Sequence, residues 1–299
     1  MSRESIQVSA YDAGAVVRRR LPLASRLARS YGAGGVSGRK RGKVSGFSAH
    51  SRSRLRNWLV RAQYTGEQVR GITLTIPGIA LASESECERI WHQWHMRANR
   101  MGVPIIWRKE VQARGAVHWH CIAWCDRVLL DRLRSNWWDS VSSLGEYKGP
   151  MRLKCGETVN CIAGSRMALP GAYEHCVAVD DDIADSGRAL RYIADHASKR
   201  KQAQSKTTGR PWGIINRRRL PLSEQGEHGI DPLVAPLFRR LARRLYAYRV
   251  PADCVFGTRI ERRSNARLLR KGEHVLIGNQ SALLRLVRWC NSQAWDLGR

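Results

Sequence analysis

The stretch Ala116-Val-His-Trp-His-Cys-Ile-Ala-Trp-Cys125 holds two histidines, His118 and His120, inside an otherwise apolar run. Its β-branched and aromatic content predicts a β-strand, on which residues i and i+2 point to the same face. The two imidazoles are therefore expected side by side, with Cα atoms roughly 6–7 Å apart, close enough to share one metal ion. The pattern also fits a pair of hydrogen-bonded structural histidines, because a buried imidazole needs some polar partner.

A second strand is expected just upstream, in Ile105-Ile-Trp-Arg-Lys-Glu-Val-Gln112. The following Ala113-Arg-Gly115 predicts a turn, since glycine readily takes a positive φ. A hairpin closed at this turn brings Glu110 next to His118. Two imidazoles and one carboxylate leave coordination positions open, as a catalytic metal requires. The alternative is that Glu110 is an exposed carboxylate in a charged Arg-Lys-Glu stretch.

Residues 185–202 predict an amphipathic helix with Tyr192, His196 and Lys199 at i, i+4 and i+7 on one face. A tyrosine beside a lysine suits attack on a phosphodiester. The lysine favours the phenolate form of a phenol whose ordinary pKa is about 10, or it holds the phosphate itself. Packing is the alternative role for a tyrosine on such a helix.

Basic residues dominate the chain, with 52 lysines and arginines against 25 acidic residues and a formal net charge of +27. Residues 1–61 alone hold 14 basic side chains against two acidic ones. Such a surface attracts nucleic acid through its phosphates, DNA and RNA alike. Residues 1–45 are rich in Gly, Ser and Arg and are expected to form a flexible arm. Its predicted DNA contacts are Arg18, Arg19, Arg20, Arg39, Lys40, Arg41 and Lys43.

Taken in order, these motifs resemble those of the HUH endonucleases, the rolling-circle replication initiators of small phages and plasmids. Ile72-Thr-Leu-Thr-Ile76 is similar to their first motif, His118-Trp-His120 to the second, and Tyr192 with Lys199 to the third. Gly209-Arg-Pro-Trp-Gly-Ile-Ile215 is similar to a segment that follows the tyrosine helix in phage-type initiators. The resemblance covers residues 46–221. His196 stands where two-tyrosine members carry their second tyrosine, so the chain resembles the single-tyrosine type.

The resemblance implies an α+β fold with a central antiparallel sheet, an RRM/ferredoxin-like core and flanking helices. It also implies that Glu110, His118 and His120 bind Mg²⁺ or Mn²⁺. Tyr192 is then the nucleophile that cleaves single-stranded origin DNA, leaving a 5′-phosphotyrosine link and a free 3′-hydroxyl. Lys199 stabilises the phosphate or phenolate, and His196 is an accessory acid or base candidate. The first-motif strand is expected to support the sheet rather than to perform chemistry.

The rest of the sequence predicts further helices, partners and a location. Helices are expected at about 84–100, 128–140 and 236–248, whereas residues 141–184 appear irregular in pattern. Residues 222–299 form a basic C-terminal region without an assigned role. No Gly-x4-Gly-Lys-Ser/Thr loop occurs, so a host helicase and DNA polymerase are the expected partners. No apolar run reaches the ~18 residues of a membrane span, and no signal peptide is recognised, which predicts a cytoplasmic protein of a bacterial host cell.

Two other functions fit the same sequence. A relaxase or a single-strand transposase would use the same HUH site for a different task. A non-catalytic, basic nucleic-acid-binding protein would carry the three motifs by coincidence. The sequence does not specify the oligomeric state.

Overall fold

The computed structural model divides the chain into two compact units, which are described separately. Unit 1 comprises residues 1–43, 56–63 and 222–299, and unit 2 comprises residues 44–55 and 64–221. The structure describes residues 5–11, 14–20, 47–64, 68–76, 84–111, 117–142, 147–152, 158–163, 176–180, 210–247, 273–277 and 280–297.

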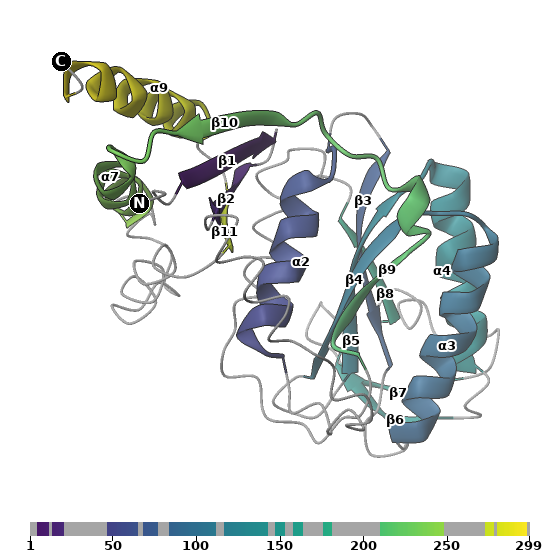
Figure 1. The fold of residues 1–299 in the computed structure, drawn as a ribbon. Helices are drawn as coiled ribbons and strands as arrows, with labels where there is room; N and C mark the ends of the chain where they lie inside the picture. Colours follow the sequence, from purple (N-terminus) through teal and green to yellow (C-terminus); the bar gives the residue numbers. More distant parts are fainter. Residues whose placement is uncertain are drawn as a thin grey trace, which may run out of the picture. The chain divides into compact units, whose positions relative to one another are not determined.

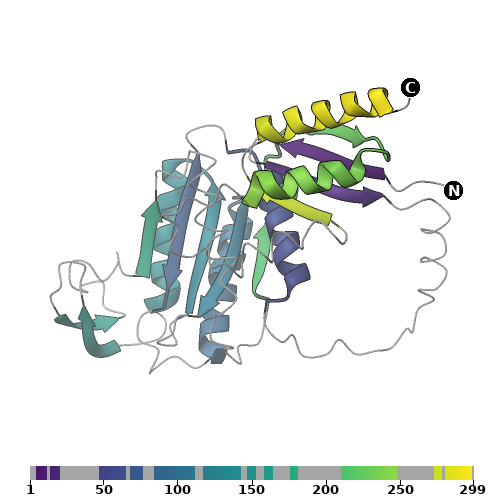
Figure 2. The ribbon, with the colours of Figure 1, turned by 90° about the vertical axis from the view of Figure 1, so that its left-hand side faces the viewer.

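Unit 2 is built on a five-stranded antiparallel sheet with the strand order β8-β3-β5-β4-β9 (Figure 2). In that order the strands are Val177–Asp180, Val69–Thr75, Val117–Trp124, Ile105–Val111 and Trp212–Ile215. The strand that contains both histidines, β5, is therefore central. This sheet, flanked by helices, confirms the predicted α+β class with a central antiparallel sheet.

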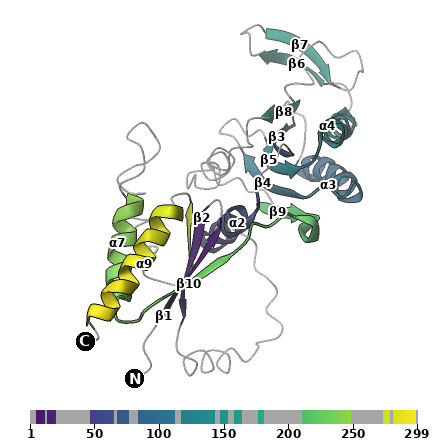
Figure 3. The same cartoon turned by 90° about the horizontal axis from the view of Figure 1, so that it is seen from above.

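Helices α3 (Glu84–Arg100) and α4 (Arg127–Ser142) lie together on one side of this sheet (Figures 1 and 3). Tryptophans fill the interior between helices and sheet. The indole of Trp119 on β5 stacks on Trp91 of α3, with ring centroids 5.0 Å apart. The Trp94 indole of α3 donates a hydrogen bond to the backbone carbonyl of Leu133 on α4, at 3.0 Å. Because strand side chains alternate between faces, this apolar face leaves the opposite face of β5 to the histidines.

Residues 141–184 contain more regular structure than their pattern indicates. They include β6 (Tyr147–Arg152), β7 (Thr158–Ala163) and the edge strand β8 of the main sheet. Strands β6 and β7 pair antiparallel in a separate two-stranded sheet. These strands have four to six residues, too few for a clear alternation of polar and apolar residues.

Unit 1 contains a four-stranded antiparallel sheet with the order β10-β1-β2-β11. The strands, in that order, are Gly226–Ile230, Ser5–Tyr11, Gly14–Arg20 and Glu273–Ile277. Helices α7 (Ala235–Ala247) and α9 (Gln280–Leu297) pack side by side on one face (Figure 3). Helix α2 (Ala49–Arg61) contributes its residues from Arg56 onward to unit 1 and the preceding ones to unit 2.

The expectation of a flexible arm over residues 1–45 is wrong for 5–11 and 14–20. Ile6, Val8 and Ala15 are buried in the core of unit 1, where α7 and α9 cover the sheet. Their strands pair with residues more than 200 positions later, as in the register pair Ile6–Ile230. The average composition of the first 45 residues conceals these two short strands, whose partners β10 and β11 are distant in sequence.

The helix predicted at 236–248 corresponds to α7, and those predicted at 84–100 and 128–140 correspond to α3 and α4. Among the described residues, no helix has the length and apolar character needed to cross a membrane.

Candidate metal centre

The candidate site lies on the face of the unit 2 sheet that points away from α3 and α4. On β5, the backbone of His118 pairs with Thr75 of β3 on one side and with Glu110 of β4 on the other. His120 pairs in the same way with Thr73 and Arg108. Directly opposite residues in an antiparallel pair point to the same face. The register therefore gathers two imidazoles, two hydroxyls, a carboxylate and a guanidinium on one surface of three adjacent strands.

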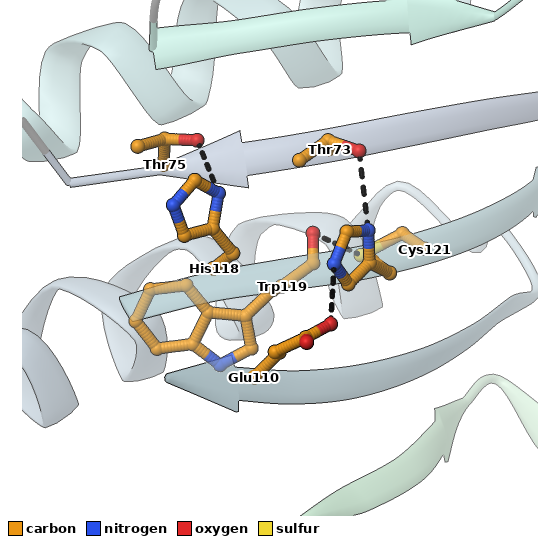
Figure 4. Close-up of polar contacts among 7 residues, drawn as sticks. Thr73, Thr75, Glu110, His118, Trp119 and Cys121 are labelled. Atoms are coloured by element: carbon orange, nitrogen blue, oxygen red, sulfur yellow. Dashed lines mark hydrogen bonds and ion pairs between the residues drawn. The ribbon is translucent and has the colours of Figure 1, made fainter. Parts of the chain in front are cut away.

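Threonine hydroxyls orient both imidazoles (Figure 4). The Oγ1 of Thr75 is 2.9 Å from Nδ1 of His118, and the Oγ1 of Thr73 is 3.3 Å from Nδ1 of His120. The two rings lie nearly parallel, at 15°, with centroids 6.4 Å apart. Since Nδ1 of each ring faces a hydroxyl, the Nε2 atoms are the nitrogens placed to meet a metal or a proton. Thr73 and Thr75 thus contact both imidazoles in addition to pairing in the sheet.

Glu110 reaches His120, its diagonal neighbour across the strand pair. The Oε2 atom of Glu110 lies 3.1 Å from Nε2 of His120, an ion pair whenever the imidazole is protonated. Glu110 is only 8% exposed. The alternative in which Glu110 is an exposed carboxylate of a charged stretch is therefore wrong. A buried carboxylate requires a polar partner, and the imidazole supplies one.

The donor set matches a divalent cation in its chemistry. Two imidazoles and one carboxylate are ligands that Mn²⁺ accepts, and three protein ligands leave open positions. As placed, however, the described residues contain no group of three or more His, Cys, Asp or Glu side chains arranged to hold a metal ion. Glu110 contacts His120 directly and the rings are 6.4 Å apart. Because all three groups already share one face, coordination requires side-chain rotation rather than a change of strand register.

Arg108 is a neighbour of the site that none of the sequence motifs includes. It is completely buried, it is the backbone partner of His120, and its guanidinium carbon lies 4.7 Å from the centroid of the Phe47 ring. The alternation of β4 was the available signal, since Arg108 and Glu110 are two residues apart and share a face. Lys109, between them, points to the helix side and forms an ion pair with Glu88 of α3.

The stretch that follows the predicted tyrosine helix borders this site. Trp212 and Gly213 belong to β9, where they pair with Arg108 and Trp107 of β4. A Cβ atom on Gly213 would lie 2.7 Å from the Trp107 ring. Glycine is therefore required for β9 to lie against that indole.

The other predicted site residues are not brought to this face by the described structure. Tyr192, His196, Lys199, Arg39, Lys40, Arg41 and Lys43 lie outside the described residues. Arg18, Arg19 and Arg20 form the end of β2, in unit 1. The roles of all these residues stay predictions.

Comparison of the chain with protein-family models, with curated proteins and with solved structures finds no match.

Proposed function

We propose that this protein is a site-specific DNA endonuclease and strand transferase that initiates rolling-circle replication. The observation that carries the proposal is the shared face of Glu110, His118 and His120, with both imidazoles oriented by threonine hydroxyls. An isolated His-x-His pattern does not require a carboxylate within hydrogen-bond distance.

In the proposed reaction, Tyr192 attacks a phosphodiester of single-stranded origin DNA. The phenolic oxygen forms a bond to phosphorus while the bond from phosphorus to the 3′-oxygen breaks. The phenolic proton passes to solvent, and the departing 3′-oxygen takes a proton and becomes the hydroxyl that primes synthesis. The phosphotyrosine link conserves a phosphoester bond, so that a later attack by a 3′-hydroxyl rejoins the strand. Lys199 stabilises the phosphate or the phenolate.

Glu110, His118 and His120 are the residues that would hold Mg²⁺ or Mn²⁺ at this site. A bound divalent ion supplies Lewis-acid polarisation of the phosphate and neutralises charge that develops during attack. The threonine hydroxyls orient the imidazoles, and in the tautomer with a proton on Nδ1 they would accept from it while Nε2 serves as the ligating nitrogen. Origin DNA, a host helicase and a host DNA polymerase are the proposed partners, and the bacterial cytoplasm is the proposed location.

The test is incubation of the purified protein with Mn²⁺ and a labelled single-stranded library that spans the encoding element, followed by a denaturing gel. A denaturation-resistant adduct is expected, with mass mapping placing the DNA on Tyr192. Tyr192→Phe should abolish the adduct. Tyr11→Phe is the matched control, because it removes only a hydroxyl that bonds to Gln225 in unit 1, at 3.0 Å. An adduct that persists in Tyr192→Phe would exclude the proposed nucleophile.

The metal ligands are tested separately from the nucleophile. His120→Ala and Glu110→Gln should remove Mn²⁺-dependent cleavage and leave salt-sensitive DNA binding intact, since neither removes a basic surface. His92→Ala, an exposed histidine of α3, is the control and should keep full activity. Full cleavage by the His120 variant would mean that this face is not the catalytic centre.

One observation favours a second function, a non-catalytic nucleic-acid-binding protein. The direct contact between Glu110 and His120 satisfies both groups without a metal ion, as in a purely structural pair. Under that function the library yields no adduct, whereas binding persists. A relaxase or transposase would form the same adduct at a site outside a replication origin.

A further inference from the structure

The helices that cover the unit 1 sheet differ in charge from those that cover the unit 2 sheet. Together α7 and α9 hold six arginines and a single aspartate. By contrast, α3 and α4 hold six arginines and five acidic residues. Exposure to solvent does not by itself require an excess of positive charge, because α3 and α4 combine positive and negative side chains. An excess of one sign concentrated on two helices indicates a partner of the opposite sign.

Each of the two helices separates its buried and exposed residues into opposite stripes. On α7, Phe238 and Ala242 are buried, whereas Arg240 and Arg244 are exposed. The same separation occurs on α9, where the buried residues are Leu283, Val287, Cys290 and Ala294 and the exposed ones include Arg285, Arg288 and Trp289. The spacing of three and four residues places these exposed side chains next to one another on their helix.

The exposed stripes belong to one surface of unit 1. The buried residues of both helices enter the same core, on the same face of the sheet, and the helices contact each other (Figure 3). Their opposite sides therefore form the outer surface of the helix layer. We call Arg240, Arg244, Arg285, Arg288 and Trp289 the arginine–tryptophan surface.

Trp289 distinguishes this surface from a general basic patch. Its side chain is 47% exposed, although burial of a tryptophan ring normally contributes favourable free energy. It lies one helical turn after Arg285, its neighbour at i−4, and directly follows the exposed Arg288 in sequence. An exposed aromatic ring among cations is the arrangement on which unpaired bases stack while their phosphates meet the cations. Duplex DNA offers phosphates only, because its bases are already stacked on one another.

We propose that the arginine–tryptophan surface binds single-stranded DNA, with the four arginines at phosphates and Trp289 stacked on a base. The identity of this DNA as the strand next to the nick rests on the proposed function. The surface would then hold the strand independently of the metal centre, which belongs to unit 2.

The arginines are tested by fluorescence anisotropy of the full-length protein with a labelled 30-nucleotide single strand in EDTA, over a range of NaCl concentrations. Each phosphate contact contributes about 0.7 to the slope of log K against log salt for single strands. The combined variant Arg240→Gln, Arg244→Gln, Arg285→Gln and Arg288→Gln should therefore lower that slope by about 3. A matched variant changes four exposed arginines of α3 and α4 to glutamine: Arg89, Arg100, Arg127 and Arg132. An equal loss of slope in both variants, or none in the first, would overturn the proposal.

The tryptophan is tested with Trp289→Ala. Loss of one base stack should weaken single-strand binding by about 5- to 150-fold at unchanged slope, and leave duplex binding nearly constant. Trp289→Phe should restore most of the affinity, because it keeps an aromatic face. Equal weakening of single-strand and duplex binding would exclude stacking. These binding measurements are made in EDTA, which prevents metal-dependent cleavage. If the wild-type protein forms no adduct in the separate assay with Mn²⁺, the proposed function is contradicted, but the measured single-strand binding still tests the arginine–tryptophan surface.

Discussion

The sharpest test of the candidate metal centre is the replacement of Thr75 by valine. Valine keeps the branched shape that packs well on a strand, so the substitution removes little besides the hydroxyl. That hydroxyl lies 2.9 Å from Nδ1 of His118. Its loss should lower the free energy of unfolding by about 1 kcal/mol, the net contribution of a typical hydrogen bond.

The effect on metal binding should be larger than the effect on stability. Removal of a hydrogen-bond partner of a ligating histidine typically weakens metal binding about 10- to 100-fold. We expect the Kd for Mn²⁺ of Thr75→Val to rise within that range. The corresponding contact between Thr73 and His120 is longer, at 3.3 Å, so Thr73→Val should have the smaller effect.

Isothermal titration calorimetry with Mn²⁺ measures the affinity, and urea denaturation measures the stability of the same samples. Thr75→Ser is the control, because it keeps the hydroxyl, and its affinity should stay near that of the wild type. An unchanged Mn²⁺ affinity in Thr75→Val would refute the argument that this hydroxyl orients a ligand. A loss of affinity shared equally by Thr75→Ser would refute it as well, by pointing to packing.

Three further predictions concern unit 2. Gly213→Ala places a methyl group against the Trp107 ring and should lower the free energy of unfolding by about 1–3 kcal/mol in urea denaturation; no change would show that the indole has room to move. Trp94→Ala should cost about 3–5 kcal/mol in the same assay, because the ring is completely buried, and a cost under about 1 kcal/mol would contradict that packing. Burial, and secondarily the nearby charge of His92, lower the pKa of His95 below its usual value of 6.5. The folded state then binds fewer protons than the unfolded state, so stability should fall as the pH drops through about 6.5, and His95→Gln should flatten that dependence. Identical pH dependence of stability in the wild type and in His95→Gln would show that His95 is not its cause.

The sequence predicts the centre of unit 2 because its signals there are local. Alternation along β4 and β5 and one short turn suffice to bring Glu110 to the histidine face. The same alternation assigns Arg108 to that face. The contact of Glu110 with its diagonal neighbour His120 depends on side-chain rotation, which strand register does not specify.

The sheet of unit 1 was not predictable by the same means. Its strands have five to seven residues, and each has a partner strand more than 200 positions away in the sequence. Local periodicity carries no information on such partners. Helix α7 was predictable because its stripe of apolar residues recurs at the helical period, whatever sheet it covers.

The strand order of unit 1 determines when that unit is able to form during synthesis. Strands β1 and β2 leave the ribosome before the other described strands, but their neighbours are β10, which ends at Ile230, and β11, which ends at Ile277. At roughly 5–20 residues per second, β1 and β2 wait about 10 to 50 s for these partners. Every strand of the main sheet of unit 2 is synthesised within that interval. A nascent chain would therefore assemble the histidine face while the hairpin of β1 and β2 still exposes the apolar residues that unit 1 later buries.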